Sequence, residues 1–424
     1  MQNTKTLIDD KNKEQKGGSD FNSIPKDGHF VNNDFPSFIK YMGSKTKILD
    51  FVVDGINEIY NGGGICDLFS GSCSIAGSLG HSVKIYSNDI QAYSESIAHA
   101  YLTSWKKEES FISGQEIITK AEKIVQKNLS HLPEGLSYDD IKGGLKEFNL
   151  VEEANQSLID VSFDFDWHLF TKYYSGTWWS SYQCLWIDAI REIAETQKSE
   201  PHYHLIISSL MHAMAYCSQG TGHYAQYRDA KTESSMKDIS NYRQKKIADF
   251  FLRKYDSVSS ELLTIPPEFD HEITTMDFRE RLATLPKCTV YADPPYCFVH
   301  YSRFYHALET LVLYDYPDLQ FKGGSVVKGR YRDDRHQSPF CIRTKVLDAF
   351  KDLFTGITLS SSNLVLSYSN TGMISLECIL KTAESIMSGY HIEIRELNHK
   401  HMTMGRKNDR DRDVKEYTLL AWKE

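Results

Sequence analysis

The chain has 424 residues, of which 41% are hydrophobic and 25% are charged, and its formal net charge is −9 at pH 7. This length allows a large core and exceeds one average domain, and the composition is ordinary for a globular protein. No apolar run is long enough to cross a bilayer, and the polar N-terminus lacks a signal-peptide core, so we expect a cytoplasmic protein with no membrane partner. The eight cysteines form no C-x-x-C pair, which indicates reduced thiols and no metal site.

The N-terminal third of the chain predicts alternating helices and strands. Residues 1–34 are polar, and we expect them to be disordered. Hydrophobic periodicity then predicts, in chain order, a helix after Ser44, a strand over 65–68, a helix from about Ser74, a strand over 85–90 and a helix over 92–105.

The turn after the first predicted strand suits a ligand that approaches the backbone. Residues 67–72 (Asp-Leu-Phe-Ser-Gly-Ser) are mostly small, and the helix that follows presents free N–H groups. The turn has neither a G-x-G-x-x-G pattern nor the lysine of a phosphate loop, which argues against a pyrophosphate ligand. About twenty residues later the second strand ends at Asp89, a spacing typical of a carboxylate that binds the two hydroxyls of a ribose. The alternative for Asp89 is a strand-end cap.

A helical insert is predicted from about residue 106 to residue 262, and it contains the first of two basic runs. A Gly-flanked aromatic loop over 220–228 enters this run, which spans 228–254, and the second run spans 322–345. The distribution of charge is a better guide to nucleic-acid binding than the negative sum, so both runs are candidates for contact with a phosphate backbone. The alternative is that each run is a solvated face.

The most informative stretch is Asp293-Pro294-Pro295-Tyr296, which follows an apolar strand predicted over 289–292. Two prolines remove two backbone N–H donors, while nearby carbonyls and the Asp293 carboxylate can accept hydrogen bonds beside the flat ring of Tyr296. Acceptors without donors next to an aromatic face are suited to an exocyclic amine on a planar base. The alternative is a rigid surface turn.

The C-terminal part of the chain supplies further elements for the same edge of the sheet. A loop over 301–306 is expected to cover the active site, and a strand over 364–370 ends in a polar turn. Two further strands, about 391–397 and 417–422, are expected to form an antiparallel hairpin with a basic loop over 399–412 between them.

Taken together, these motifs resemble those of the D12-class, α-type DNA adenine-N6 methyltransferases, the class that includes Dam. Tyr41-Met42-Gly43-Ser44-Lys45 is similar to the N-terminal motif of that class, and residues 67–72 to its Gly-containing cofactor motif, with Cys73 in place of a last glycine. Asn88-Asp89-Ile90 is similar to the ribose-binding segment, Met276-Asp277-Phe278 to the adenine-reading segment, and residues 293–296 to the catalytic tetrad.

The resemblance implies a Rossmann-like α/β fold that binds S-adenosylmethionine without a metal. The catalytic domain would comprise residues 35–105 and 263–424, and the helical insert over 106–262 would be a target-recognition domain. The implied catalytic residues are Asp293, Pro294, Pro295 and Tyr296. The implied cofactor-binding residues are Tyr41, Lys45, Asp67, Phe69, Ser70, Gly71, Ser72, Asp89, Ile90, Asp277 and Phe278.

The expected partner is double-stranded DNA, whose adenine would be flipped into the site. Within the basic runs, Arg243, Lys245 and Lys246 are the candidates for phosphate contacts, and Arg330, Arg332 and Arg335 are the candidates for base contacts. The remaining DNA-binding candidates are Tyr224 and Arg228 in the aromatic loop and Arg303 in the loop after the tetrad.

The biological setting implied is a prokaryote or phage, with the protein associated with the nucleoid. It would be the modification enzyme of a restriction-modification system, with an endonuclease encoded separately, or an orphan or phage methylase. Cytosine-N4 methylation is the alternative chemistry, although Asp293 favours adenine. A catalytically inactive DNA-binding relative is the alternative from another class, and the intact tetrad argues against it.

Overall fold

The computed structural model describes residues 35–43, 45–103, 111–139, 141–199, 202–220, 222–262, 269–296, 298, 300–402 and 411–423. The segment 1–34, predicted to be disordered, lies outside these residues.

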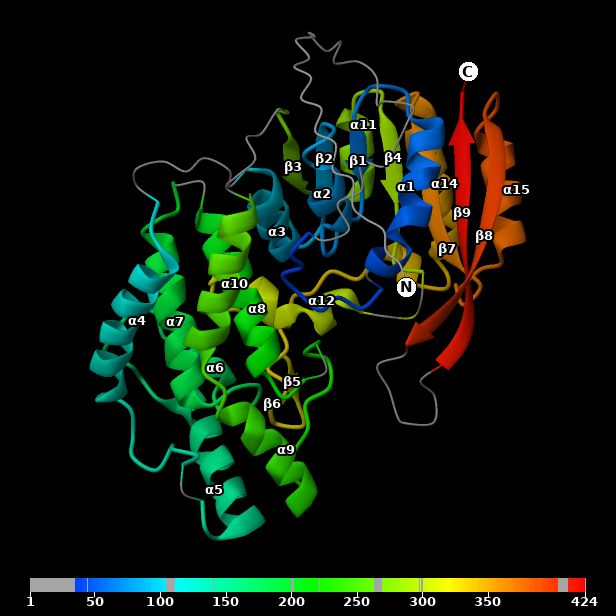
Figure 1. The fold of residues 1–424 in the computed structure, drawn as a ribbon. Coiled ribbons are helices and arrows are strands. Elements are labelled where there is room, and N and C mark those ends of the chain that lie inside the picture. The colour runs from blue at the N-terminus through cyan, green and yellow to red at the C-terminus, as the bar shows by residue number, and fades with distance from the viewer. Residues whose placement is uncertain are drawn as a thin grey trace, which may run out of the picture.

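A seven-stranded sheet forms the centre of the fold, with the strand order β3-β2-β1-β4-β7-β9-β8 (Figure 1). The first five strands in this order pair in parallel, whereas β9 runs antiparallel to β7 and β8 runs antiparallel to β9. The strands are β1 (Ile65–Asp67), β2 (Ile85–Asp89), β3 (Glu272–Thr275), β4 (Thr289–Ala292), β7 (Asn363–Ser369), β8 (His391–Met402) and β9 (Asp411–Trp422). The predicted Rossmann-like α/β fold, with a mostly parallel sheet, is confirmed.

Helices cover both faces of the sheet. Because alternate strand residues point to opposite faces, Val365 of β7 packs into one apolar cluster with Val52 and Ile56, and Leu364 and Leu366 pack into another. The first face is covered by α1 (Leu49–Ile59), which follows the 3-10 turn η1 (Lys45–Ile48), and by α2 (Ser74–Leu79) and α3 (Ala92–Leu102). The second face is covered by α11 (Phe278–Thr284), α14 (Val346–Leu359) and α15 (Leu376–Ile386). A sheet covered on both faces explains why β4 and β7 are buried along their whole length.

The predicted insert is a group of helices beside the sheet (Figure 1). Its elements are α4 (Gly114–Leu129), α5 (Gly144–Gln156), η2 (Ser157–Asp160), α6 (Leu169–Tyr174), α7 (Ser181–Glu195), α8 (Tyr203–Cys217), α9 (Glu233–Arg243) and α10 (Ile247–Leu262). Helix α8 packs against α3 of the sheet layer, so the two groups share one apolar core.

The segment between β4 and β7 carries several short elements before α14. They are α12 (Tyr301–Phe304), α13 (His306–Leu313), the small hairpin of β5 (Phe321–Lys322) and β6 (Ser325–Val326), and η3 (Pro339–Cys341). Residues 301–306, predicted to be a loop, are therefore mainly helical.

The terminal hairpin is present but longer than predicted. Strand β8 continues to Met402 and β9 begins at Asp411, with these two residues in register. The predicted loop over 399–412 therefore has the wrong bounds, and its middle, 403–410, lies outside the described residues. Polar side chains at both strand ends conceal the alternation from which strands are predicted.

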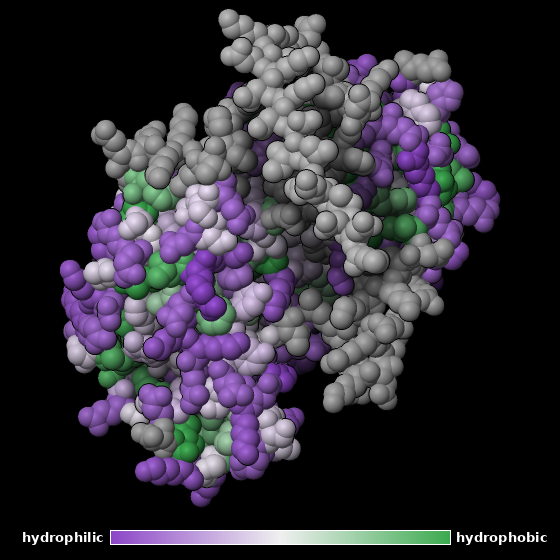
Figure 2. Space-filling view, in the orientation of Figure 1, coloured by the Kyte–Doolittle hydropathy of each residue, from purple (hydrophilic) through white to green (hydrophobic). Residues whose placement is uncertain are grey.

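The described helices include none with both the length and the apolar character that a transmembrane helix requires. The face of the molecule shown in Figure 2 is largely hydrophilic where its residues are described, with hydrophobic residues only in small scattered patches. The residues that suggest a ligand line a cavity at the edge of the sheet.

Candidate functional site

A cavity lies where the carboxyl ends of β1, β2, β3 and β4 meet. Parallel strands end at one edge of a sheet, and this edge is the usual ligand site of open α/β folds. The cavity has about 1170 Å³ of empty volume, including space open to solvent. All fifteen residues implied as catalytic or cofactor-binding line it: Tyr41, Lys45, Asp67, Phe69, Ser70, Gly71, Ser72, Asp89, Ile90, Asp277, Phe278, Asp293, Pro294, Pro295 and Tyr296.

The turn after β1 is fastened to the end of β2. The hydroxyl of Ser70 lies 2.7 Å from that of Ser87 and donates to the carbonyl of Asn88 at 3.0 Å. Gly71 has a φ of +50°, and a Cβ there would lie 2.8 Å from the ring of Tyr41. Glycine is therefore required both for the backbone conformation and for the close approach of an aromatic ring.

Asp89 is held by two backbone donors. Gly71 N–H donates to Oδ2 at 2.9 Å and Gln91 N–H donates to Oδ1 at 3.0 Å. Burial raises the pKa of Asp89, while these hydrogen bonds oppose the shift. The Asp89 carboxylate is therefore fixed beside the turn, and its remaining lone pairs can accept hydrogen bonds from a ligand.

Asp67, at the end of β1, is a buried carboxylate with no hydrogen-bond donor or cation beside it in the described part of the chain. Burial, together with the charges of Asp293 and Asp89, raises its pKa well above the usual value. An unpartnered buried carboxylate is costly, so a cationic ligand group at this position would be favoured.

An aromatic wall lies on the β3 side of the cavity. The ring of Phe278 lies 5.6 Å from that of Phe69 and 5.2 Å from that of Phe340. Asp277 caps α11 by accepting from Arg279 N–H at 2.9 Å. This wall combines a carboxylate with apolar faces, a combination that can hold a planar base with an amine.

The tetrad lies directly after β4, on the opposite side of the cavity from the turn after β2. Lys45 Nζ lies 3.3 Å from Asp293 Oδ1 and donates to the Tyr296 hydroxyl at 3.1 Å. The Tyr296 ring packs edge-on against the Tyr368 ring, with 5.5 Å between the ring centres. The backbone carbonyl of Tyr296 accepts a hydrogen bond from Met373 N–H at 3.1 Å. Within the described residues, no donor contacts the carbonyl of Pro294.

The ionisation of this group follows from burial and neighbouring charge. Burial raises the pKa of Asp293 to about 6, although the Lys45 ammonium opposes the shift. Burial alone would lower the pKa of Lys45, but the charge of Asp293 and its other neighbours raises it well above the usual value. At neutral pH the tetrad therefore carries the Asp293 carboxylate, and the Lys45 ammonium beside it is charged.

Cys73 occupies a position where a glycine would be unstrained. Its φ is +58°, in the left-handed region, and it is fully buried immediately before α2. The thiol donates to the carbonyl of Ser94 at 3.3 Å. A non-glycine residue in this region carries a backbone strain of about 1–3 kcal/mol.

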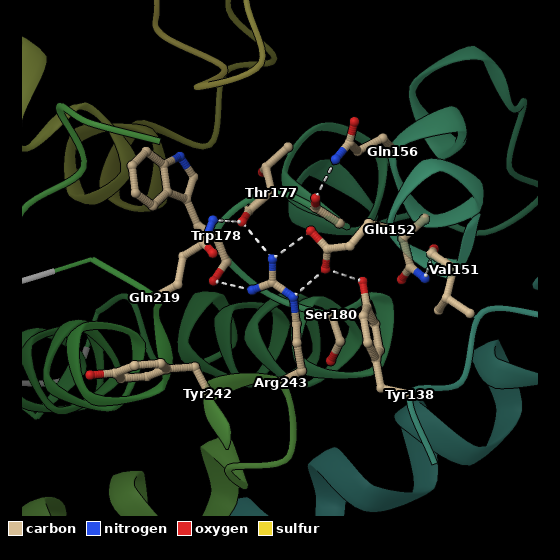
Figure 3. A network of polar contacts seen from close by, with 12 residues as sticks. Tyr138, Val151, Glu152, Gln156, Thr177, Trp178, Ser180, Gln219, Tyr242 and Arg243 are labelled. Carbon is tan, nitrogen blue, oxygen red and sulfur yellow. Dashed lines mark hydrogen bonds and ion pairs between the residues drawn. The ribbon is translucent and has the colours of Figure 1, made fainter. Parts of the chain in front are cut away.

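Arg243 is buried among the helices of the insert. Its guanidinium is buried, donates to Glu152 at 2.8 and 3.1 Å, and donates to the carbonyls of Thr177 and Trp178 (Figure 3). Tyr138 donates to the same Glu152 carboxylate at 2.7 Å. The prediction that Arg243 contacts phosphate is therefore wrong in this structure, because its donors are used to join α9, α5 and the segment before α7.

Three other DNA-binding candidates are also buried. Tyr224 is 1% exposed and packs against Trp178 and Trp179. Arg330 is 6% exposed and donates to the carbonyl of Gln156, and Arg332 forms a two-bond pair with Asp315 at 2.7 and 2.6 Å. These contacts correct the predicted roles of Tyr224, Arg330 and Arg332, because sequence alone does not distinguish a buried from an exposed arginine.

The remaining candidates differ in whether their donors already have partners. Arg303 is exposed, and its guanidinium lies 4.5 Å from the ring centre of Tyr331. The guanidinium of Arg335 lies over the same ring, 5.9 Å from its centre. Two nitrogens of Arg335 are buried without a partner in the described residues. Lys246 is exposed, whereas Arg228 pairs with Asp238 at 2.8 Å and Lys245 donates to the carbonyl of Tyr216.

One polar residue at the tetrad was not predicted. Glu416, on β9, is 3% exposed and its Oε2 lies 3.6 Å from Lys45 Nζ. Acids at the carboxyl ends of strands indicate such a site, whereas Glu416 lies in the first half of its strand. In the sequence, Glu416 is distinguished only as an acid shortly before the stretch Thr418–Ala421, which the structure shows to be buried.

The parallel sheet with its antiparallel β9–β8 edge, and the acidic cavity at the strand ends, define a Rossmann-like methyltransferase fold. The family model described as D12 class N6 adenine-specific DNA methyltransferase matches residues 41–364, which is more than half of the chain. The chain therefore belongs to that family.

Curated relatives agree with this assignment. Modification methylase LlaI of Lactococcus lactis subsp. lactis is 24% identical over 351 residues, which are 81% of this chain and 48% of that protein. Modification methylase StsI of Streptococcus sanguinis is 24% identical over 80% of this chain and 45% of its own length. Type II methyltransferase M.NlaIII of Neisseria lactamica is 23% identical over 80% of this chain and 85% of its own length. The chain spans about half the length of the first two relatives.

Proposed function

We propose that this protein transfers a methyl group from S-adenosylmethionine to N6 of an adenine in double-stranded DNA. The observation that carries the proposal is the single cavity that joins the Asp293–Tyr296 tetrad to the acids at the ends of β1 and β2. Two ligands, a methyl donor and a base, therefore have places on opposite sides of one space.

The chemistry of the donor set supports S-adenosylmethionine on the β1–β2 side. Asp67, buried with no partner among the described residues, suits the ammonium of the methionine end, and Asp89 suits the ribose hydroxyls. Asp277 with Phe69 and Phe278 suits the adenine ring, and Tyr41, Ser70, Ser72 and Ile90 complete the lining. When bound, the cofactor supplies an electrophilic methyl group, which forms a bond to N6 as its bond to sulfur breaks.

The tetrad supports a base amine as the acceptor. Asp293 and the carbonyl of Pro294, which no donor of the described residues contacts, would accept hydrogen bonds from N6, and this draws the nitrogen lone pair out of conjugation with the ring. Tyr296 would stack on the base, and Pro295 keeps the turn rigid and free of a competing N–H donor. The methylated nitrogen then releases one proton to solvent. Catalysis of this kind depends mainly on positioning and on preorganised charge.

DNA is the proposed source of the amine. An adenine within a duplex must be flipped out to reach the cavity, at a cost of a few kcal/mol. Arg303 and Arg335, close to the cavity-lining residues Ser302 and His336, are the side chains best placed to bind backbone phosphate beside the flipped nucleotide. Both guanidinium groups lie over the ring of Tyr331, and two nitrogens of Arg335 have no partner among the described residues, which supports a site completed by an anion. We retain Lys246 as a more remote phosphate contact and the insert as the target-recognition domain.

Restriction-modification is the proposed setting, with a cognate endonuclease encoded separately. The support is that two relatives carry the name modification methylase and another is named a Type II methyltransferase. An orphan or phage methylase would use the same chemistry.

The test is transfer of tritiated methyl from S-adenosylmethionine to duplex DNA, followed by nucleoside analysis. We expect N6-methyladenine at one short sequence, which long-read sequencing of the product would identify. Label recovered as N4-methylcytosine would establish the alternative chemistry. No transfer to any genomic duplex, by protein that binds the cofactor, would indicate a DNA-binding relative without activity.

A further inference from the structure

The C-terminal strand β9 brings a second carboxylate to the tetrad. Glu416 pairs in register with Ser369, the last residue of β7. Because β9 is antiparallel to β7, the first half of β9 lies at the edge where the parallel strands end. The family model ends at residue 364, so Glu416 lies outside the matched segment.

The Glu416 carboxylate contacts two of the groups that surround Asp293. Its Oε2 lies 3.6 Å from Lys45 Nζ, and its Oε1 accepts from the Tyr296 hydroxyl at 3.4 Å. Lys45 in turn lies 3.3 Å from Asp293 and donates to the same hydroxyl. One buried ammonium is thus shared between two carboxylates, and one phenol is held by both Lys45 and Glu416.

The sharing of the Lys45 ammonium affects how well Asp293 can accept a hydrogen bond from the target amine. If Asp293 were the only carboxylate near Lys45, the ammonium would bind it fully and occupy the oxygen that the target amine needs. A second carboxylate 3.6 Å from the ammonium lets Lys45 remain in place, paired and buried, when the amine takes a lone pair of Asp293. The Tyr296 ring is fixed at the same time, since its hydroxyl is bound at two points.

We propose that Glu416 is a positioning residue of the methyl transfer: it holds Lys45 and Tyr296 so that Asp293 is free to accept the target amine. This inference rests on the proposed function. Glu416 itself need not contact either substrate.

The test is Glu416→Gln, compared with wild type in steady-state methylation of duplex DNA. We expect kcat to fall at least about tenfold, while KM and Kd for S-adenosylmethionine stay within about twofold, because Glu416 does not belong to the β1–β2 side of the cavity. The matched control is Glu396→Gln on the paired strand β8, whose carboxylate is exposed and bonded to Lys415. It should behave as wild type.

The pH profile separates positioning from a merely structural role. The charged and titratable groups facing Asp293 are Lys45, Glu416, Asp67, Tyr291, Tyr296 and Tyr301. Removing the negative charge of Glu416 should lower the pKa of Asp293, so the acidic limb of kcat should move to lower pH in Glu416→Gln. A fall in kcat with no movement of that limb, or a wild-type kcat, would overturn the inference.

A second variant tests the inference if Glu416→Gln does not fold. Glu416→Asp keeps the charge but withdraws the carboxylate by one methylene, so we expect a lower kcat with the acidic limb near its wild-type position. A wild-type kcat in this variant would also overturn the inference. Wild-type protein that methylates no duplex would instead refute the proposed function, and this inference with it.

Discussion

The backbone N–H of Gly71 donates a 2.9 Å hydrogen bond to Oδ2 of Asp89, and so joins the turn after β1 to the end of β2. The two motifs are eighteen residues apart in sequence, and this bond makes them one rigid side of the cavity. It therefore links the geometry of the turn to the position of the carboxylate proposed to bind ribose.

We expect Asp89→Asn to weaken S-adenosylmethionine binding by roughly 10- to 100-fold, since a hydrogen bond to a charged group is worth about 1.5–3 kcal/mol. The amide oxygen can still accept from Gly71, so the turn should remain in place. Isothermal calorimetry measures the effect, and Asp348→Asn, an exposed acid paired with Lys351, is the control. An unchanged dissociation constant would remove Asp89 from the cofactor site.

Gly71→Ala should weaken cofactor binding by roughly tenfold or more, because left-handed strain costs about 1–3 kcal/mol. The new Cβ would also meet the Tyr41 ring, which stacks on Tyr305 at 4.8 Å and has little room to move. Gly389→Ala is a matched control, since its φ is +78° and nothing lies within 4 Å of the added carbon. Equal effects of the two variants on cofactor affinity would show that strain at Gly71 has no local consequence.

Asp293→Ala should lower methyl transfer by at least about 100-fold, the size of losing one preorganised charged partner. Cofactor affinity should change little, because Asp293 is proposed to accept from the target amine. Single-turnover transfer and calorimetry measure the two quantities. Activity within tenfold of wild type would contradict the mechanism.

The pH dependence of wild-type kcat/KM for duplex DNA provides an independent test of the same residue, because this ratio reports ionisation of the free enzyme. Burial raises the pKa of Asp293 to about 6, and only the ionised form offers both oxygens as acceptors. Activity should therefore be present above about pH 6 and be lost as the pH falls through that value. A constant kcat/KM between pH 5 and pH 7, in folded protein, would exclude Asp293 as the titrating acceptor.

Replacing Arg303 and Arg335 together by Gln should weaken DNA binding and reduce its salt dependence. Each lost phosphate contact lowers the slope of log K against log salt by about 0.9. Filter binding at several salt concentrations measures this slope, with Lys381→Gln, an exposed residue of α15, as the control. An altered methylation sequence with an unchanged slope would show instead that Arg335 reads a base, as the sequence suggested.

Arg243→Met should destabilise the protein rather than alter its salt dependence. Removing one partner of a buried ion pair costs about 3–5 kcal/mol, because the Glu152 charge is left uncompensated. Urea unfolding measures the loss, and the exposed neighbour Lys246→Met should leave the free energy of unfolding nearly unchanged. A stable Arg243→Met variant with a reduced salt slope would restore the phosphate-binding prediction.

The sequence by itself determined the α/β fold and fifteen of the residues that line the cavity. Apolar strands that end in Asp67, Asp89 and Asp293 are local patterns, and parallel strands bring their carboxyl ends to one edge. The tertiary structure decided the matters that depend on distant neighbours. Arg243 is buried because Glu152, on another helix, pairs with it, and Glu416 reaches the tetrad because β9 runs antiparallel to β7. Charge and spacing along a chain do not record which side chains lose their water, and that loss separates a structural arginine from one free to bind DNA.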